Sequence, residues 1–280
     1  MASPLIALLT DFGRADWYVA CMKAIMLSRC PTARLVDITH EIPPQDITAG
    51  AFILAAAASW FPPQTVFACV VDPGVGTRRA LIAAHADRHI LVGPDNGLLS
   101  LVLQRAKRTS LVRLTEDRYW LPSVSHTFQG RDIIAPVAAH LASRCSLARL
   151  GVSTTTYQTL SIPPPQRQGK VLEGRILHID AFGNLITNLP SDISLREMSE
   201  SEKPPSKMPW LRDSSQQLRY HGAPVRVVSS YQEGRAGELV ALAGSMGYVE
   251  LAIRNGSAAA RCRAKRGDRV RVILERHDVR

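Results

Sequence analysis

The first 160 residues combine two hydrophobic patterns, one typical of buried strands and one typical of helices. Short, mainly apolar segments predict strands at 5–10, 35–38 and 65–71. Two further runs, on either side of the turn residues 86–88, predict a hairpin of strands 81–85 and 89–92. Apolar residues at helical spacing predict helices at 17–28, 47–60, 96–106 and 132–143. Strands that alternate with helices indicate an N-terminal α/β domain with a mostly parallel sheet covered on both faces.

The pattern changes after residue 160. Three consecutive prolines, at 163–165, cannot continue a helix or a central strand, so we assign 161–169 to a linker between domains at 1–160 and 170–280. Short β-branched runs separated by Gly or Asn follow, at 170–180, 223–230, 239–243, 248–253 and 269–274. They predict a smaller, antiparallel β-barrel domain. The polar segment 199–217 between them predicts a surface insertion.

The composition is that of an ordinary globular chain. Of its 280 residues, 46% are hydrophobic and 21% are charged, which excludes a disordered or fibrous protein. The longest apolar stretch, 49–61, is too short to span a bilayer, and the apolar run 4–10 lacks the basic flank of a signal peptide. We therefore expect a cytoplasmic protein. The five cysteines are scattered without a C-x-x-C pair, so we expect buried, reduced thiols rather than disulfides or a zinc site.

The net charge of +10 is concentrated at the C-terminal end. Residues 254–280 contain nine Lys or Arg and three acidic residues, which accounts for +6 of the total. Such a segment can attract nucleic acid or another anionic partner. It has no aromatic residue on which a base could stack, so the favoured interpretation is a solvated strand face, and nucleic acid is not an expected partner.

Two carboxylates stand where ligands bind in α/β sheets. Asp11 and Asp72 each follow a predicted strand, and in open sheets ligands bind beyond the carboxyl ends of the strands. A Pro-Gly turn, a second glycine and two arginines come after Asp72. The chain has neither a P-loop nor a G-x-S-x-G motif, which argues against phosphate-cradling NTPases and triad hydrolases. His85 and His89 lie on opposite arms of the predicted hairpin and do not indicate a metal site.

Six motifs, taken together and in order, resemble one known family. They are TDFG at 10–13, VDPGVGTRR at 71–79, GPDNGLL at 93–99, TFQGRDIIAPVAAHLA at 127–142, IDAFGNLITN at 179–188, and GSMGYVELA through NGSAA at 244–259. The chain resembles the S-adenosyl-L-methionine (SAM) hydroxide adenosyltransferases, or SAM hydrolases, which are related to the fluorinase and chlorinase. The resemblance implies an α/β domain joined to a β-barrel domain. It also implies a homotrimer that binds SAM between one subunit's N-terminal domain and its neighbour's C-terminal domain.

The resemblance further implies a hydrolase reaction and a set of residues that carry it. Water or hydroxide attacks C5′ of the ribose, methionine leaves and adenosine remains. Because the sulfonium is already a good leaving group, we expect no cofactor and no metal. Asp72 orients the water, Arg79 stabilises the hydroxide and Gln129 completes the catalytic set. The implied substrate-binding residues are Asp11 for the ribose hydroxyls, Asp180 for the methionine ammonium, Ser245 at its amino-acid end, and Phe182, Asn184, Asn255 and Gly256 on the adenine side. Tyr248 is a further implied substrate-binding residue.

Gln129 departs from the family pattern, which has a histidine at this position. Glutamine can form hydrogen bonds with water or with Arg79, but it cannot take up a proton near neutral pH. His126 does not replace it, because in an extended segment a side chain three residues away points to the opposite face. We therefore assign Gln129 a positioning role.

Two alternative functions remain open from the sequence. The first is a halide adenosyltransferase that forms 5′-halo-adenosine, since halide attack needs no base. Asp72 opposes it, because a carboxylate at the nucleophile position repels chloride, and the halogenating relatives replace this aspartate. The second is a non-catalytic protein that binds an adenosine ligand or nucleic acid, against which the retained Asp72 and Arg79 argue.

Overall fold

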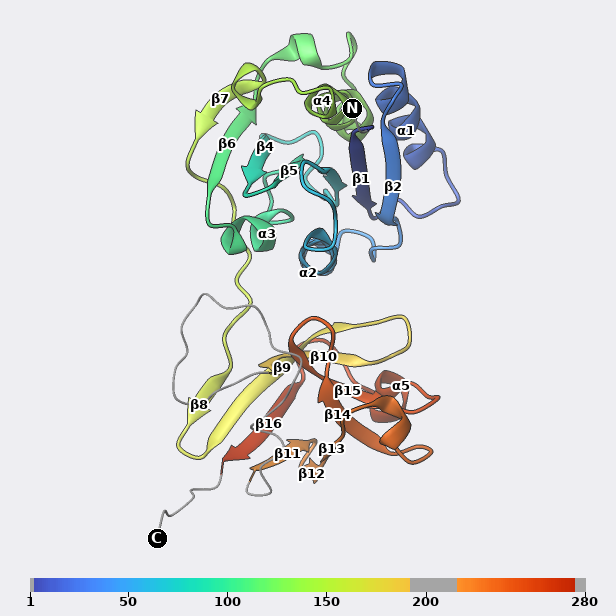
Figure 1. Cartoon of the computed structure of the whole chain (residues 1–280), viewed down its shortest axis with the longest axis vertical. Helices are drawn as coiled ribbons and strands as arrows, with labels where there is room; N and C mark the ends of the chain where they lie inside the picture. The colour runs from blue at the N-terminus through green and yellow to red at the C-terminus, as the bar shows by residue number, and fades with distance from the viewer. Residues whose placement is uncertain (1–2, 192–215, 275–280) are drawn as a thin grey trace. The chain divides into compact units, whose positions relative to one another are not determined.

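The chain folds into two compact units, residues 1–160 and 161–280 (Figure 1). The computed structural model describes residues 3–191 and 216–274. Most of the predicted insertion 199–217 therefore lies outside the described residues, and its last two residues begin a strand. Among the described residues, no helix is long and apolar enough to cross a membrane.

The first unit contains a seven-stranded sheet with the order β2-β1-β3-β5-β4-β6-β7. The α/β class is confirmed, but the sheet is mixed: three of its six strand pairings are parallel and three are antiparallel. The hairpin of β4 and β5 forms as predicted, whereas β6 and β7 were not predicted. The strands are β1 Leu5–Thr10, β2 Arg34–Thr39, β3 Val66–Val70, β4 Leu81–Ala86, β5 His89–Pro94, β6 Thr109–Leu114 and β7 Gly151–Thr154.

Helices cover both faces of this sheet (Figure 1). Successive residues of a strand point to opposite faces, so Ile6 of β1 packs in the same cluster as Met22 of α1, and Ala7 packs in that of Leu54 of α2. The predicted helix 132–143 is a π-helical turn, Gly130–Ile134, that continues as α4. The helices are α1 Tyr18–Arg29 and α4 Ala135–Ala142 on one face, and α2 Ile47–Ala58 and α3 Ser100–Arg105 on the other.

The second unit is a nearly closed, barrel-like sheet with the order β12-β11-β16-β9-β10-β15-β14-β13. The two edge strands, β12 and β13, are separated along the chain only by Val225, and this short connection brings the sheet's edges together. The strands are β9 Val171–Ile179, β10 Leu185–Pro190, β11 Gln216–Tyr220, β12 Ala223–Pro224, β13 Arg226–Val227, β14 Leu239–Ala243, β15 Tyr248–Ile253 and β16 Arg269–Leu274.

Three details of the second unit differ from the sequence predictions. Gln166–Gln168, which we assigned to the linker, forms the short strand β8 and pairs with β9. The predicted loop 255–259 turns into helix α5, Ala258–Cys262, whose first turn is capped by the Ser257 hydroxyl oxygen accepting the Ala260 N–H at 3.0 Å. All five cysteines are free thiols, but only Cys30 and Cys69 are buried.

Part of the basic C-terminal end is an exposed strand face. Arg269 and Arg271 of β16 lie two residues apart and point outward, because the alternating residues Val270 and Val272 are fully buried in the core. Both arginines pair with the carboxylate of Glu173 on the neighbouring strand β9, at 3.2 and 3.0 Å. These charges are therefore solvated and partly neutralised.

Candidate functional site

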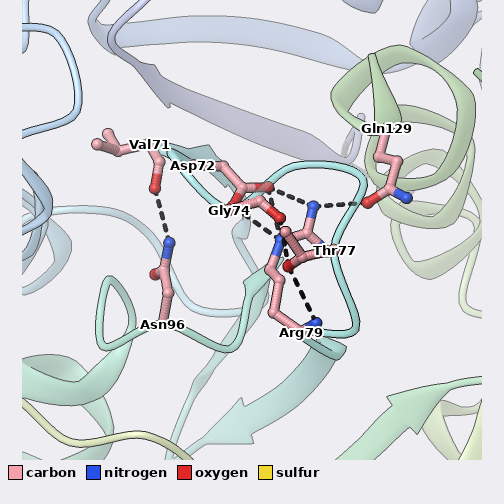
Figure 2. Close-up of polar contacts among 7 residues, drawn as sticks. All are labelled: Val71, Asp72, Gly74, Thr77, Arg79, Asn96 and Gln129. Carbon is pink, nitrogen blue, oxygen red and sulfur yellow. Dashed lines mark hydrogen bonds and ion pairs between the residues drawn. The ribbon is translucent and has the colours of Figure 1, made fainter. Parts of the chain in front are cut away.

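The loop after β3 folds back so that Arg79 meets Asp72. At its start the Val71 carbonyl accepts a hydrogen bond from the Asn96 side-chain amide at 2.8 Å (Figure 2). Inside the loop, the Thr77 hydroxyl donates to the Gly74 carbonyl at 2.7 Å, and the Arg79 N–H donates to the Thr77 hydroxyl at 3.3 Å. The Pro-Gly and Gly-Thr turns thus reverse the chain within eight residues.

Asp72, Arg79 and Gln129, the predicted catalytic residues, lie in direct contact (Figure 2). The Arg79 Nε donates to both Asp72 carboxylate oxygens, at 2.7 and 2.8 Å, and Nη2 also contacts Oδ2. The same Nη2 donates to the Gln129 Oε1 at 2.5 Å. The side chains of Asp72 and Arg79 are only 5% and 11% exposed. A buried arginine thus fixes both the carboxylate and the amide oxygen.

A close packing contact places Gln129 beside this loop. A Cβ atom at Gly76 would lie 2.5 Å from the His126 carbonyl oxygen, so only a glycine lets the 72–79 loop approach the 126–129 segment this closely. Gln129 immediately precedes the π-helical turn that leads into α4. The position of its amide is therefore set by both the loop and the helix.

Asp11 occupies the end of the neighbouring parallel strand. Its N–H donates to the Val70 carbonyl of β3 at 3.3 Å, and its Oδ2 accepts the Gln45 N–H at 2.8 Å. Burial raises the pKa of Asp11, and the charge of Asp72 adds to the rise, although the hydrogen bond from Gln45 lowers it. The two aspartates therefore act on one another across the carboxyl ends of β1 and β3.

A cavity of about 380 Å³ opens between these residues. One wall is aromatic: Phe12, Tyr18 and Phe128 form a cluster with ring centroids 5.0 to 5.8 Å apart. Phe12 and Phe128 are the sequence neighbours of Asp11 and Gln129 in the motifs, so the sequence indicated that they lie near the site. Nothing in the sequence indicated that Tyr18 and Gln45 lie there. The lining residues are Asp11, Phe12, Tyr18, Pro44, Gln45, Val70, Asp72, Pro73, Val75, Thr127, Phe128, Gln129 and Gly130.

In the second unit, the residues predicted for the methionine ammonium and the adenine side lie on loops that follow β9 and β15. The carboxylate of Asp180 accepts three hydrogen bonds: Oδ1 from the N–H groups of Phe182 and Asn184, at 2.9 and 2.8 Å, and Oδ2 from the Asn184 amide at 3.0 Å. Asn184 is buried, whereas Phe182 is 79% exposed. Its ring is therefore free to take up a flat apolar ligand.

The 180–184 loop packs on the loop that contains Asn255 and Gly256. The Ala259 N–H donates to the Gly183 carbonyl at 2.8 Å. Gly183 has φ +81°, and a Cβ atom there would lie 2.0 Å from the Ser257 hydroxyl oxygen. Asn255 and Gly256 are exposed at the end of β15. Four residues predicted for the adenine side thus lie on two loops that contact each other.

Ser245 lies in the turn between β14 and β15, and Tyr248 is the first residue of β15. The Gly244 N–H donates to the Tyr248 carbonyl at 2.9 Å and the Gly247 N–H to the Gly244 carbonyl at 3.0 Å, which leaves Ser245 exposed at the tip. Two residues after Tyr248, Glu250 is a buried carboxylate that the sequence analysis did not identify. The one sequence feature that could have indicated it is a charged residue within an otherwise apolar strand.

The described residues include no group of three or more His, Cys, Asp or Glu side chains placed to hold a metal ion. A hollow of about 610 Å³ on the second unit contains none of the predicted site residues. Its lining residues are Val171, Arg219, His221, Gly222, Asp268, Arg269, Arg271 and Ile273.

Comparison with known proteins gives consistent matches over both units. Family models described as the SAM hydroxide adenosyltransferase N-terminal and C-terminal domains match residues 6–151 and 174–271. A Salinispora tropica protein named (R)-S-adenosyl-L-methionine hydrolase is 38% identical, covering 96% of this chain and 98% of the relative. A Thermotoga maritima crystal structure superposes with a TM-score of 0.84 at 31% identity, covering 96% and 99% of the two chains. An Actinoplanes fluorinase is 29% identical, covering 67% and 72%.

Proposed function

The chain belongs to the SAM hydroxide adenosyltransferase family, and from this premise we propose that it hydrolyses SAM to adenosine and L-methionine at Asp72. The observation that carries the proposal is the Asp72–Arg79–Gln129 contact beside a cavity at the carboxyl ends of β1 and β3. A fixed carboxylate that lines a cavity can hold one water molecule in line with a carbon centre once the substrate fills the rest of the space.

The reaction is a displacement at C5′ of the ribose. A water molecule that donates a hydrogen bond to Asp72 attacks C5′, the carbon–sulfur bond breaks, and its electron pair returns to sulfur as the thioether of methionine. The water's proton passes to Asp72 and then to solvent. Because both carboxylate oxygens already accept from Arg79, Asp72 has its remaining lone pairs for this one water. Positioned proton acceptors of this kind contribute about 10²–10⁴-fold in rate.

Arg79 and Gln129 position and stabilise the reacting groups. The guanidinium stabilises the negative charge that develops on the attacking oxygen. Gln129 accepts from Arg79 through Oε1, so it holds the guanidinium in place, and its amide cannot take up a proton. The proposal therefore needs no histidine base.

The remaining site residues bind the substrate. Asp11 accepts the ribose hydroxyls, since Gln45 occupies only one position on its Oδ2. Asp180 and Ser245 bind the methionine end together with Tyr248. Phe182, Asn184, Asn255 and Gly256 bind the adenine. We propose no cofactor or metal, because the sulfonium leaves readily without one.

We propose a homotrimer in which the active site is shared between subunits. In this assembly Asp11 and Asp72 of one subunit act together with the residues that the neighbouring subunit contributes from its 161–280 unit. The family resemblance supports this proposal, as does the division of the site residues between the two units. Cytoplasmic location stays a prediction from the sequence.

The test is a product analysis of the purified protein with SAM, by chromatography with mass detection, in chloride-free and chloride-containing buffer. We expect adenosine and methionine in both buffers, and their loss in Asp72→Asn. Asp117→Asn, an exposed aspartate in the same unit, is the matched control and should keep full activity. A 5′-chloro product that appears only with chloride would assign the protein to the halogenating branch. Intact SAM that stays bound would indicate a non-catalytic binding protein.

A further inference from the structure

Glu250 is a buried carboxylate that the proposed mechanism does not use. It lies on β15 between two apolar residues, Ile186 on β10 and Leu242 on β14, and is only 7% exposed. Among the described residues its one hydrogen-bond donor is the Tyr231 hydroxyl, 2.6 Å from Oε1, and no Lys, Arg or His pairs with it. A buried carboxylate without a cationic partner is costly to keep.

A second carboxylate adds to this local negative charge. Burial raises the pKa of Glu250, and the charge of Asp180 raises it further, although the hydrogen bond from Tyr231 lowers it. The two acids therefore act on one another. A cationic ligand bound near both would remove this repulsion.

One oxygen of Glu250 faces the turn that contains Ser245. The Oε2 atom accepts no hydrogen bond from a described residue, and a Cβ atom at Gly244 would lie 3.0 Å from it. Gly244 thus leaves open the space in front of Oε2, directly beside Ser245. An unpaired acceptor that faces this turn is placed to receive a donor from a ligand.

Asp180 cannot bind an ammonium group alone. An ammonium has three N–H donors, whereas a carboxylate has about four acceptor positions. Three of those on Asp180 are already occupied by Phe182 and Asn184, so about one remains. The Ser245 hydroxyl can accept a second N–H, and a third acceptor is still needed.

We propose that Glu250 is this third acceptor: its Oε2, together with Asp180 and Ser245, binds the α-ammonium group of the substrate's methionine end. The proposal rests on the proposed function and adds a specificity-determining residue to it. It explains why a charged residue is kept inside an apolar strand. It also predicts that the enzyme selects ligands with an α-ammonium group and binds those without it poorly.

The test compares SAM with an analogue whose α-amino group is replaced by hydrogen. One charge-assisted hydrogen bond contributes about 10- to 100-fold, so Glu250→Gln should lower kcat/KM for SAM by about that factor, mainly through KM. For the analogue, kcat/KM of Glu250→Gln should stay within about twofold of the wild-type value. Glu238→Gln, which removes a charge paired with Arg226 elsewhere in the same unit, is the matched control. It should leave kcat/KM unchanged for both substrates.

Further variants separate ammonium recognition from a structural role. Thermal melting reports whether Glu250→Gln is folded, and Glu250→Asp, which keeps the charge, should retain part of the preference for SAM. Tyr231→Phe leaves Oε2 in place and should keep the preference within about threefold. Equal losses on both substrates, or no loss on either, would overturn the proposal. A wild-type protein that hydrolyses neither would contradict the proposed function instead, and calorimetric binding of L-methionine to wild type and Glu250→Gln would still decide the role of Glu250.

Discussion

At the scale of single residues, the geometry of Arg79 decides how precisely Asp72 is held. A guanidinium presents its N–H groups as a planar fork that matches a carboxylate, whereas a lysine ammonium is a single flexible charge. In this chain the fork contacts both Asp72 oxygens and Gln129 at once. Charge alone therefore does not reproduce the arrangement.

Arg79→Lys should consequently lower kcat about 10- to 100-fold while KM for SAM changes little, because the substitution keeps the positive charge but loses the orientation of Asp72. Steady-state kinetics with SAM measure both parameters. Arg78→Lys, at the exposed neighbouring position, is the control and should behave as wild type. Wild-type kcat in Arg79→Lys would show that the orientation of the carboxylate is unimportant.

Asp11 gives the site a dependence on pH. Burial and the charge of Asp72 raise its pKa above the usual value for an aspartate, so it takes up a proton at a higher pH than an exposed aspartate does. The protonated form loses acceptor capacity for the ribose hydroxyls. KM for SAM should therefore rise as the pH falls through this raised pKa. Asp11→Asn should have a raised KM at neutral pH and a weaker acid dependence, and an unchanged acid dependence would exclude Asp11 as its source.

At the scale of elements, a continuous apolar run is the most direct sequence sign of a strand. The strands β1 and β3 are buried on both faces, and their sequences show it directly. The strand β10 was missed because it contains polar residues and a proline. In the structure Thr187 and Asn188 are buried, and they donate to the carbonyls of Val249 and Pro163, at 2.8 and 2.6 Å. Such partners are distant in sequence, so no local pattern reveals them.

The candidate site was also predictable only in part. The motifs indicated side chains such as Asp72 and Arg79, whose seven-residue spacing spans one reversing loop. They did not indicate the Gln45 N–H that donates to Asp11, because a backbone donor has no sequence signature. Glu250 was missed for another reason. Its burial and its hydrogen bond from Tyr231 make it a candidate binding residue, and both arise only from the fold.

The contact between the two loops of the second unit can be tested at Gly183. Its φ of +81° strains any other residue, and an added Cβ would lie 2.0 Å from the Ser257 hydroxyl oxygen. Gly183→Ala should therefore lower the free energy of unfolding by about 1–3 kcal/mol and weaken SAM binding. Gly169→Ala is the matched control, because φ is +59° there but no atom lies within 4 Å. Equal effects of the two variants in thermal melting would show that backbone strain alone is responsible.

At the scale of the whole molecule, the proposed shared active site makes a prediction about mixed assemblies. Asp72→Ala and Asp180→Ala should each be inactive alone, since each lacks one half of every site. Mixed trimers of the two should regain part of the activity, because some of their sites combine an intact half from each subunit. The measurement is the SAM-hydrolysing activity of the mixture. Native mass spectrometry verifies that the subunits have exchanged. Verified exchange without recovered activity would rule out a site shared between subunits.

In the proposed mechanism, a water molecule held by Asp72 attacks C5′ directly. The most direct measurement is a single turnover of SAM, with enzyme in excess, in water labelled with heavy oxygen, followed by mass analysis of the adenosine and of the peptide that contains Asp72. Direct attack predicts that the 5′-oxygen of adenosine carries the label and that Asp72 does not. Unlabelled adenosine with label in the Asp72 carboxylate would contradict direct attack by water, because it would show that the carboxylate itself had formed the bond to C5′.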